Sequence, residues 1–311
     1  MIKVFDLFKQ SFERYLDGYL KHVHAYEPIN EAYKYSILNG GKRLRPCLVY
    51  LGAFATAKRN EFYNPEDLII ELAVGIELIH SYSLVHDDLP CMDNDSLRRG
   101  KPTTHVKYGA GMATITGDAM LNGAAELMLS ALDNEFYMAC PLVKDNYKAQ
   151  VEATKYILKQ SGINGMIGGQ CLDIRENSKN PSKDELITMY KLKTSALLKA
   201  ALVAGALRFE ADEDVIYAFE QYAEKFGILF QIQDDILDLT STAEELGKDV
   251  NQDKANNKFT YIDAVGGIEQ AKLDALSYAE EAKASIKNVE GKIFGAELFY
   301  ELIDDMIARK K

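Results

Sequence analysis

Aspartates gather at two places in the sequence, and each group follows an apolar stretch. The first group lies within HDDLPCMDND at residues 86–95 and contains Asp87, Asp88 and Asp93. On an uninterrupted helix Asp87 and Asp93 would point about 240° apart, but Pro90 disfavours helical backbone at the preceding residue and lets the chain fold back. We therefore expect Asp87 and Asp88 at the end of a helix, with Asp93 on the turn that follows.

The second group lies within FQIQDDILD at residues 230–238. Asp234 and Asp238 share a helix face, and Asp235 is three residues before Asp238, so the spacing predicts that all three carboxylates converge. Carboxylates this close disfavour one another's ionisation unless a cation compensates, and neither group contains a lysine or arginine at adjacent helical positions. Mg²⁺ takes one or two carboxylates together with phosphate oxygens and water. Two such groups that face each other would hold a diphosphate between them.

Other interpretations of these segments are weaker. A single acidic group of this kind is most often a solvated helix face, and it is the presence of two groups behind apolar helices that favours a metal site. A calcium-binding EF-hand is excluded, because the loop that starts at Asp93 lacks glycine at its sixth position. GAG at residues 109–111 has neither a preceding strand nor the third glycine of a dinucleotide-binding loop.

Cationic residues that could bind phosphate lie near both aspartate groups. GGKRLRP at residues 40–46 places three cations on a flexible loop, and Arg98 and Arg99 directly follow the first group. Arginine matches phosphate oxygens with two parallel hydrogen bonds, and lysine supplies a point charge. His80 falls two helical turns before Asp87 and, taken alone, is more typical of a hydrogen-bonded core histidine. Further candidates are Lys193, Lys248 and Lys258.

The composition is that of a folded, acidic protein. The chain has 311 residues, 36 Lys and Arg against 47 Asp and Glu, a formal net charge of −11 and 47% hydrophobic residues. The basic excess that nucleic-acid binding requires is absent. The four cysteines show no zinc or disulfide spacing, which fits a reducing cytoplasm. The N-terminal segment lacks the apolar core of a secretory signal, and no apolar stretch reaches the roughly 20 residues of a membrane span.

Helical spacing runs through the sequence, and strand signatures are scarce. The last 130 residues contain no proline, which allows long uninterrupted helices. Residues 68–79 are apolar on nearly all sides and predict a buried helix, for which Asn64 and Pro65 supply the start. Residues 197–207 mix large and small side chains, which allows close contacts between helices. Since no linker or repeat divides the chain, we predict an all-α fold in a single large helical domain.

Five segments together carry a family resemblance. They are GGKRLRP, HDDLPCMDNDSLRRGKPTTH, GGQCLDI, KTSALL and FQIQDDILD, at residues 40–46, 86–105, 168–174, 193–198 and 230–238. In this order they resemble the trans-isoprenyl (polyprenyl) diphosphate synthases, with bacterial farnesyl and short-chain geranylgeranyl enzymes most similar. The resemblance implies one polyprenyl synthase domain over residues 1–311, an all-helical isoprenoid-synthase fold around a deep central cavity, and a homodimer.

The resemblance also implies roles for individual residues. A cluster of Mg²⁺ ions, three in the family once substrate is bound, would be held by Asp87, Asp88, Asp93 and Asp234, with Asp235 and Asp238 completing the second motif. The contacts to isopentenyl diphosphate would be Lys42, Arg45, His80 and Arg99. The contacts to the allylic diphosphate would be Arg98, Lys193, Thr194, Gln231, Lys248 and Lys258. Many relatives have Tyr-Pro where this chain has Tyr261-Ile262.

In the family's mechanism, metals and cations stabilise the diphosphate that leaves the allylic substrate, and the double bond of isopentenyl diphosphate attacks the cation left behind. The proton is lost to the departing diphosphate, so we expect no side-chain base. Relatives limit product length with the residues four and five before the first aspartate, here Ser83 and Tyr82. Helix geometry places Ser83 below Asp87 but turns Tyr82 about 140° away. A bulky ring there favours farnesyl diphosphate over the alternative, geranylgeranyl diphosphate.

Other functions share part of these features. A class I terpene cyclase also ionises allylic diphosphates, but the second aspartate motif and the GGKRLRP loop argue against it. A non-catalytic regulatory subunit typically lacks one or both aspartate motifs, and both are complete here. A purely structural bundle would leave six aspartates near apolar helices unexplained. The partners that we expect are isopentenyl and allylic diphosphates, and neither nucleic acid nor membrane.

Overall fold

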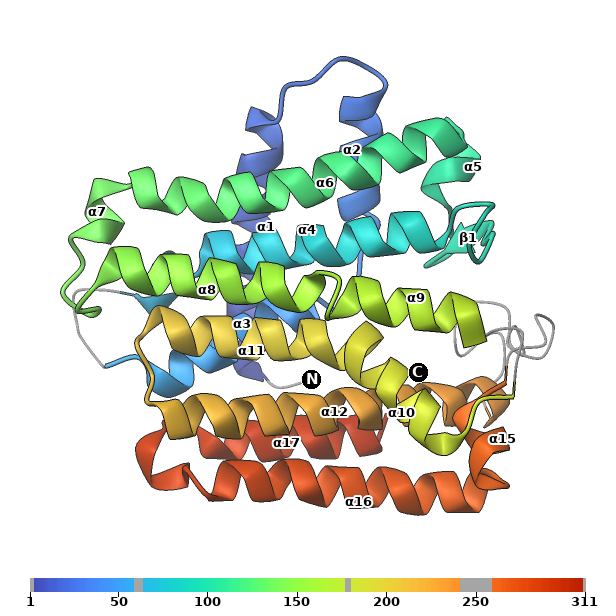
Figure 1. Ribbon diagram of the computed structural model, residues 1–311. Coiled ribbons are helices and arrows are strands. Elements are labelled where there is room, and N and C mark those ends of the chain that lie inside the picture. Colours follow the sequence, from blue (N-terminus) through green and yellow to red (C-terminus); the bar gives the residue numbers. More distant parts are fainter. Residues whose placement is uncertain (1–2, 59–63, 177–179, 241–258, 310–311) are drawn as a thin grey trace.

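The fold is a bundle of long helices with almost no strand (Figure 1). The computed structural model describes residues 3–58, 64–176, 180–240 and 259–309. The helices are α1 (Lys3–His22), α2 (Ile29–Ile37), α3 (Leu44–Thr56), α4 (Ile70–Asp87), α5 (Thr104–Tyr108), α6 (Ala110–Ser130), α7 (Glu135–Met138), α8 (Asn146–Ser161), α9 (Met166–Glu176), α10 (Lys183–Tyr190), α11 (Ala196–Arg208), α12 (Glu213–Thr240), α15 (Tyr261–Val265), α16 (Ile268–Lys287) and α17 (Ala296–Ile307). Single helical turns are η1 (Pro65–Leu68), η2 (Ala131–Asp133), the π-helical turn η3 (Lys191–Ser195) and η4 (Glu290–Lys292), and the strands are β1 (Leu97–Arg98) and β2 (Lys101–Pro102). The predicted all-α class is confirmed.

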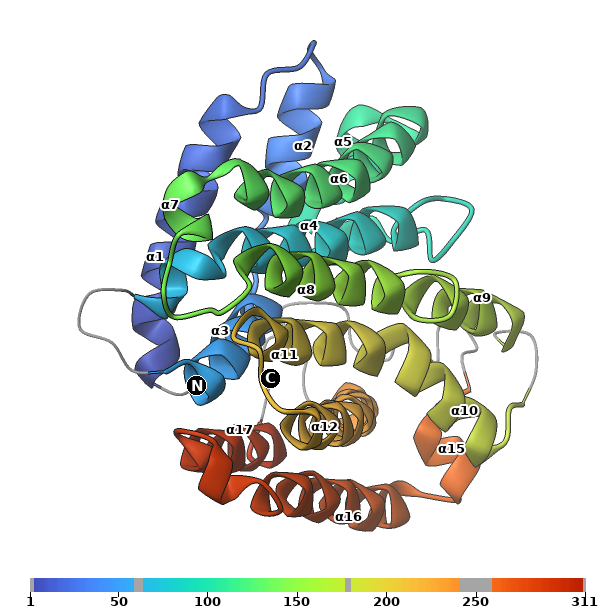
Figure 2. The same ribbon diagram turned by 60° about the vertical axis from the view of Figure 1, so that its left-hand side comes forward.

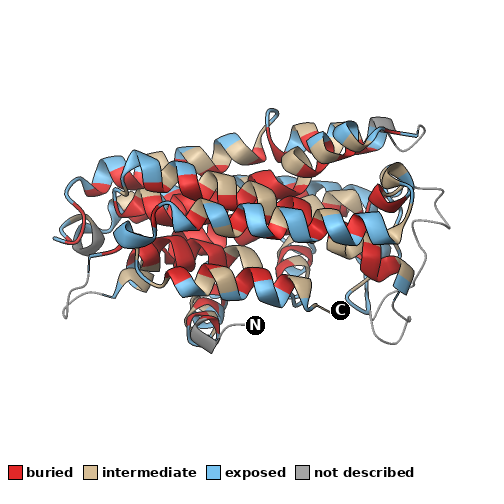
Figure 3. Cartoon of the chain, turned by 90° about the horizontal axis from the view of Figure 1, so that it is seen from below, coloured by how far each residue is buried: buried red, intermediate tan, exposed pale blue. Residues whose placement is uncertain are grey.

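The long helices share one general direction. Helices α4, α6, α8, α11, α12 and α16 lie roughly alongside one another, whereas α1 and α2 run across them at a steep angle (Figures 1 and 2). Buried residues face the interior of this bundle (Figure 3). The C-terminal ends of α4 and α12, which carry the two aspartate groups, lie at the same end of the bundle as β1 and α15 (Figure 1). In the described ranges no helix is both long and apolar enough to cross a membrane.

Helix α4 is the buried helix that the sequence predicts, but it begins later than expected. Nearly all of its residues are buried, from Ile70 to Val85. The Asn64 side chain does accept a hydrogen bond from the Glu66 backbone nitrogen, at 3.2 Å, yet this cap starts the 3₁₀ turn η1. The cap therefore belongs to η1, and Ile69 separates that turn from α4.

Small residues bring α3 and α11 into backbone contact, as the mixed residue sizes of segment 197–207 predict. A Cβ atom on Gly205 would lie 2.0 Å from the carbonyl oxygen of Val49, and one on Gly52 would lie 2.0 Å from that of Leu202. No side chain fits in so short a gap. Glycine at both positions therefore sets the distance between these two core helices.

A two-stranded hairpin is the one departure from the predicted absence of strands in the described residues. Leu97 pairs with Pro102 and Arg98 with Lys101, so the turn consists of Arg99 and Gly100, both with positive φ. Such a turn normally contains Asn-Gly or Asp-Gly. Because arginine stands at its first position here, the sequence did not predict the hairpin. The hairpin places two cations beside the end of α4.

Arg43 connects the N-terminal helices to the core. It has a left-handed backbone conformation just before α3 and is only 5% exposed. Its guanidinium donates to Glu13 of α1 at 2.8 Å, to Glu77 of α4 at 2.9 Å and to the Ile37 carbonyl at 3.1 Å. Of the three cations in the GGKRLRP loop, this one therefore has a structural role.

We predict that Arg43→Met destabilises the protein by about 3–5 kcal/mol, because the substitution leaves the Glu77 carboxylate buried without its partner. Lys21→Met is the matched control, since its 2.5 Å ion pair with Asp17 is exposed on both sides and should contribute less than about 1 kcal/mol. Urea unfolding of both variants measures the difference. Equal losses would show that the Arg43 pair contributes no more than a surface pair.

Candidate active site

Two adjoining cavities open between the ends of α4, α9 and α12. The larger, of about 960 Å³, contains predicted residues from both aspartate groups, and the smaller, of about 650 Å³, lies over the GGKRLRP loop. Predicted residues that line the larger cavity are Arg45, His80, Tyr82, Ser83, Asp87, Arg98, Arg99, Lys193, Thr194, Gln231 and Asp234. Those that line the smaller one are Lys42, Arg45, His80 and Arg99. The predicted residues Lys248 and Lys258 lie outside the described residues.

The first aspartate group folds back on itself as the Pro90 break predicts. Helix α4 ends at Asp87, and the backbone nitrogen of Asp93 donates to the Asp87 carbonyl at 2.9 Å. Burial raises the pKa of the Asp87 carboxyl to about 6; nearby Lys193 opposes this shift and Asp93 adds to it. The ionised form of Asp87 is therefore costly until a further cation arrives.

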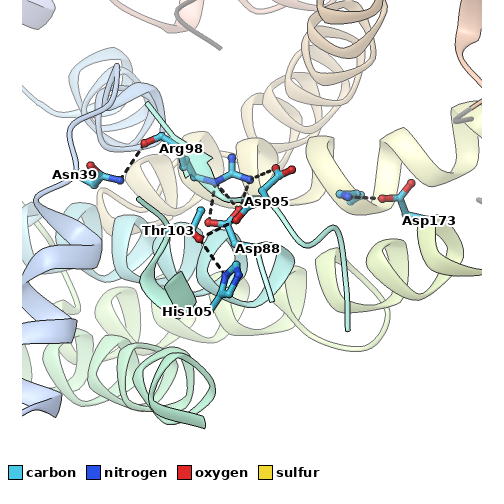
Figure 4. A network of polar contacts seen from close by, with 8 residues as sticks. Asn39, Asp88, Asp95, Arg98, Thr103, His105 and Asp173 are labelled. Carbon is cyan, nitrogen blue, oxygen red and sulfur yellow. Dashed lines mark hydrogen bonds and ion pairs between the residues drawn. The ribbon is translucent and has the colours of Figure 1, made fainter. Parts of the chain in front are cut away.

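Asp88 is held by an arginine ten positions later in the chain. Arg98, on the hairpin, donates to both carboxylate oxygens, with its Nε at 2.8 and 3.0 Å and its Nη2 at 2.5 Å (Figure 4). Asp88 itself is only 4% exposed, and burial raises its pKa although Arg98 opposes the shift. The expected allylic contact Arg98 thus lies in the cavity wall, bound to an expected metal ligand.

The structure does not bring the three aspartates of the second group together. Asp234 lines the larger cavity and pairs with Arg309 at 2.6 Å. Asp235 instead accepts hydrogen bonds from the Tyr190 hydroxyl at 2.9 Å and the Tyr261 backbone nitrogen at 2.8 Å, while Asp238 is buried. Asp235 lies about 100° around the helix from Asp234 and binds Tyr190 and Tyr261, so the expected convergence of all three was wrong. Nowhere in the described ranges do three His, Cys, Asp or Glu side chains form a ligand set by themselves.

Lys193 reaches the cavity from the π-helical turn η3. The turn interrupts the helix that would otherwise continue from α10 into α11, and Lys193 Nζ pairs with Asp173 of α9 at 2.5 Å. Close contact between α9 and η3 requires glycine, because a Cβ on Gly169 would lie 2.1 Å from the Lys193 backbone nitrogen. Sequence reasoning missed both the turn and Asp173, although GGQCLDI contains the glycine and the aspartate that form this contact.

The wall between the two cavities is cationic. Arg45 and Arg99 line both, and the buried Nε of Arg45 has no hydrogen-bond partner among the described residues. Arg99 is fixed by a hydrogen bond from Nη1 to the Gly40 carbonyl. Burial and the neighbouring Arg45 hold the pKa of His80 well below its usual range. A neutral imidazole and two guanidinium groups with an unused donor form a site for an anion.

The residues expected below the substrate are in the larger cavity. Tyr82 is 5% exposed, packs edge-on against the His86 ring, and has a buried hydroxyl with no partner among the described residues. The Ser83 hydroxyl donates to the His80 carbonyl at 2.9 Å. Both residues line the cavity, although helix arithmetic turns Tyr82 away from Asp87. Cavity residues that sequence reasoning did not select include Gln170, Phe230 and Arg309.

The depressed pKa of His80 predicts a loss of stability in acid. Below about pH 6.5 the unfolded chain takes up a proton that the buried imidazole does not, so the free energy of unfolding falls as the pH decreases. We expect His80→Gln to lower this slope between pH 6.5 and 5 by up to one proton, ~1.4 kcal/mol per pH unit. Urea unfolding across this range measures it, with His24→Gln as an exposed control. An unchanged slope in His80→Gln would contradict the assignment.

The contact at Gly169 predicts the effect of adding one methyl group. Gly169→Ala should push η3 away from α9, destabilise the protein by about 1–3 kcal/mol and displace Lys193. Because Lys193 is one of the five lysine and arginine side chains that line the larger cavity, affinity for inorganic diphosphate should fall at least tenfold, as measured by calorimetry. Gly18→Ala, in α1 with open space around it, is the control. Undiminished diphosphate affinity in Gly169→Ala would show that the tight packing does not position Lys193.

Comparisons with known proteins agree with this geometry. The family model described as polyprenyl synthetase matches residues 26–290. The farnesyl diphosphate synthase of Bacillus subtilis (strain 168) is 34% identical over 301 residues, covering 97% of this chain and 95% of the relative. The geranylgeranyl diphosphate synthase of Cyanophora paradoxa is 36% identical, with 85% and 83% covered.

A solved structure shows the same fold. The geranyltransferase of Helicobacter pylori, described in complex with magnesium and isoprenyl diphosphate, aligns with a TM-score of 0.80 at 29% identity, over 99% of this chain and 97% of the other. The similarity therefore extends over the entire helical bundle and includes both aspartate-bearing helix ends. On this evidence of sequence, fold and cavity, the chain belongs to the polyprenyl synthetase family and is a trans-prenyl diphosphate synthase, a prenyltransferase enzyme.

Proposed function

We propose that this protein is a Mg²⁺-dependent farnesyl diphosphate synthase that acts as a homodimer and condenses isopentenyl diphosphate with dimethylallyl and geranyl diphosphate. The observation that supports this most strongly is the pair of adjoining cavities, which share Arg45, His80, Arg99 and Phe230 in their common wall. A condensation of two diphosphates needs two anion sites close enough for the carbon ends to meet. The larger cavity takes the allylic substrate and the smaller takes isopentenyl diphosphate.

The residues of the larger cavity suit a hard divalent cation. Asp87 and Asp234 supply carboxylate oxygens from α4 and α12. Arg98 pairs with Asp88 and Arg309 pairs with Asp234, which shows that these carboxylates attract positive charge. Mg²⁺ commonly takes only one or two carboxylates when phosphate oxygens complete its shell, so a cage of three protein ligands is not required. When bound, Mg²⁺ supplies Lewis-acid stabilisation of the departing diphosphate.

The chain's own residues prepare the reaction. Lys193, fixed by Asp173, and Arg98 present positive charge where the leaving diphosphate becomes more negative. Arg45, Arg99 and neutral His80 hold the second diphosphate. Apolar side chains of α9 and of the loop after α4 also line the cavity, and with substrate bound they would shield the allylic cation from water. They are the buried Met166 and the partly exposed Met92, Ile167 and Ile174. No side chain is assigned as a base.

Product length is the finer part of the proposal. The Tyr82 ring occupies the cavity wall below Asp87, and the relatives include both farnesyl and geranylgeranyl enzymes. Ser83, a small residue that also lines the cavity, favours the second candidate, a geranylgeranyl diphosphate synthase. We favour farnesyl diphosphate because the aromatic ring of Tyr82 is large and nearly buried. It should restrict the cavity more than the small side chain of Ser83 enlarges it.

The experiment is incubation with Mg²⁺, isopentenyl diphosphate and, separately, dimethylallyl, geranyl or farnesyl diphosphate, with products identified by mass spectrometry. We expect a fifteen-carbon end product from the two shorter acceptors and none from farnesyl diphosphate. Elongation of farnesyl diphosphate to twenty carbons would replace the product assignment by the second candidate. Failure of every condensation would reject the synthase proposal and favour a regulatory subunit.

Tyr82→Ala should extend the product to twenty carbons or more, because removal of the ring deepens the cavity. Tyr82→Phe is the matched control: it keeps the ring and removes a hydroxyl that has no partner among the described residues, so the product should not change. The same mass-spectrometric assay measures both variants. A fifteen-carbon limit that survives Tyr82→Ala would mean that another group ends the cavity.

A further inference from the structure

The segment after α17 reaches into the larger cavity and binds the second aspartate group. Arg309 Nη1 pairs with Asp234 Oδ1 at 2.6 Å, and its guanidinium carbon lies 4.9 Å from the centroid of the Phe230 ring. Next to Asp234, Gln233 Nε2 donates to the Ile307 carbonyl at 3.1 Å. Asp234 and Phe230 therefore hold the arginine directly by an ion pair and a cation–π contact, and Gln233 holds the end of α17 two residues before it.

This ion pair lies where ligands must arrive. Arg309 and Asp234 both line the cavity that also contains Asp87 and Lys193, and their side chains are 19% and 38% exposed. A guanidinium this close to the carboxylate repels any second cation on the same group. It also offers two parallel donors to a phosphate, so a diphosphate in the cavity would give Arg309 a new partner.

We propose that Arg309 is a built-in counter-ion for Asp234 that couples cation binding at this carboxylate to diphosphate binding. Without diphosphate, a divalent cation must displace the guanidinium from Asp234 with no compensation. With diphosphate present, Arg309 can exchange the carboxylate for phosphate oxygens, and Asp234 becomes available. The coupling is reciprocal, so the divalent cation also strengthens diphosphate binding through the same residue. This inference rests on the proposed function, because it assumes a diphosphate substrate and a divalent cation in this cavity.

The test measures binding and needs no turnover. Titration calorimetry with Mg²⁺ is carried out on the full-length protein, with and without inorganic diphosphate, for the wild type and Arg309→Gln. We expect Arg309→Gln to bind Mg²⁺ about twofold to fivefold more tightly without diphosphate, the range for a partly exposed ion pair. We also expect diphosphate to enhance Mg²⁺ affinity less in this variant than in the wild type. Arg309→Lys should retain most of the wild-type coupling.

A matched control separates this effect from general changes in charge. Lys283→Gln removes a 2.7 Å ion pair to Asp304 on α17; neither residue lines the two cavities, so both Mg²⁺ titrations should be unchanged. Equal Mg²⁺ affinities in the wild type and Arg309→Gln, with or without diphosphate, would overturn the coupling. So would weaker Mg²⁺ binding in Arg309→Gln without diphosphate. If the wild type condenses substrates but shows no coupling, the synthase proposal is kept and the coupling is rejected. If the wild type condenses nothing, the synthase proposal itself is rejected.

Discussion

The organisation of this protein depends on ion pairs between buried or half-buried side chains at one end of an apolar bundle. A buried carboxylate is tolerated only with a compensating charge or hydrogen bonds. Three aspartates near the cavity have a compensating cation: Asp88 has Arg98, Asp234 has Arg309, and Asp173 has Lys193. The cations that a diphosphate would use are therefore already present and already oriented.

Each of these pairs joins two different structural elements, and this explains the architecture around the cavity. The hairpin carries Arg98, which binds Asp88 at the end of α4. The π-helical turn carries Lys193, which binds Asp173 on α9. An ordinary α-helical continuation from α10 into α11 would rotate Lys193 away from its position. Single-turn π-helical segments are common at functional sites for this reason.

Much of the site could be predicted from the sequence because the residues that form it cluster in short motifs. Apolar periodicity predicted α4 and the all-α class, and the Pro90 break predicted the return of Asp93 to Asp87. The sequence did not predict which residue binds each carboxylate. Arg309 lies 75 positions from Asp234, and Asp235 is bound by Tyr190 and Tyr261, so local spacing could not have identified these partners.

The position of Tyr82 shows why cavity depth is a property of two packed helices and not of one side chain. Residues on several sides of the last turns of α4 line the larger cavity, His80, Tyr82, Ser83, His86 and Asp87 among them, so a 140° turn from Asp87 does not remove Tyr82 from it. The Tyr82 ring packs on His86, whose Nε2 is 3.0 Å from the Thr114 carbonyl oxygen of α6. His86 fits there only because Gly117 has no side chain: a Cβ would lie 2.1 Å from its Nε2. The contact between α4 and α6 therefore fixes His86, and His86 supports the ring of Tyr82. On the proposed function, the depth available to a growing prenyl chain would follow from how closely these two helices approach.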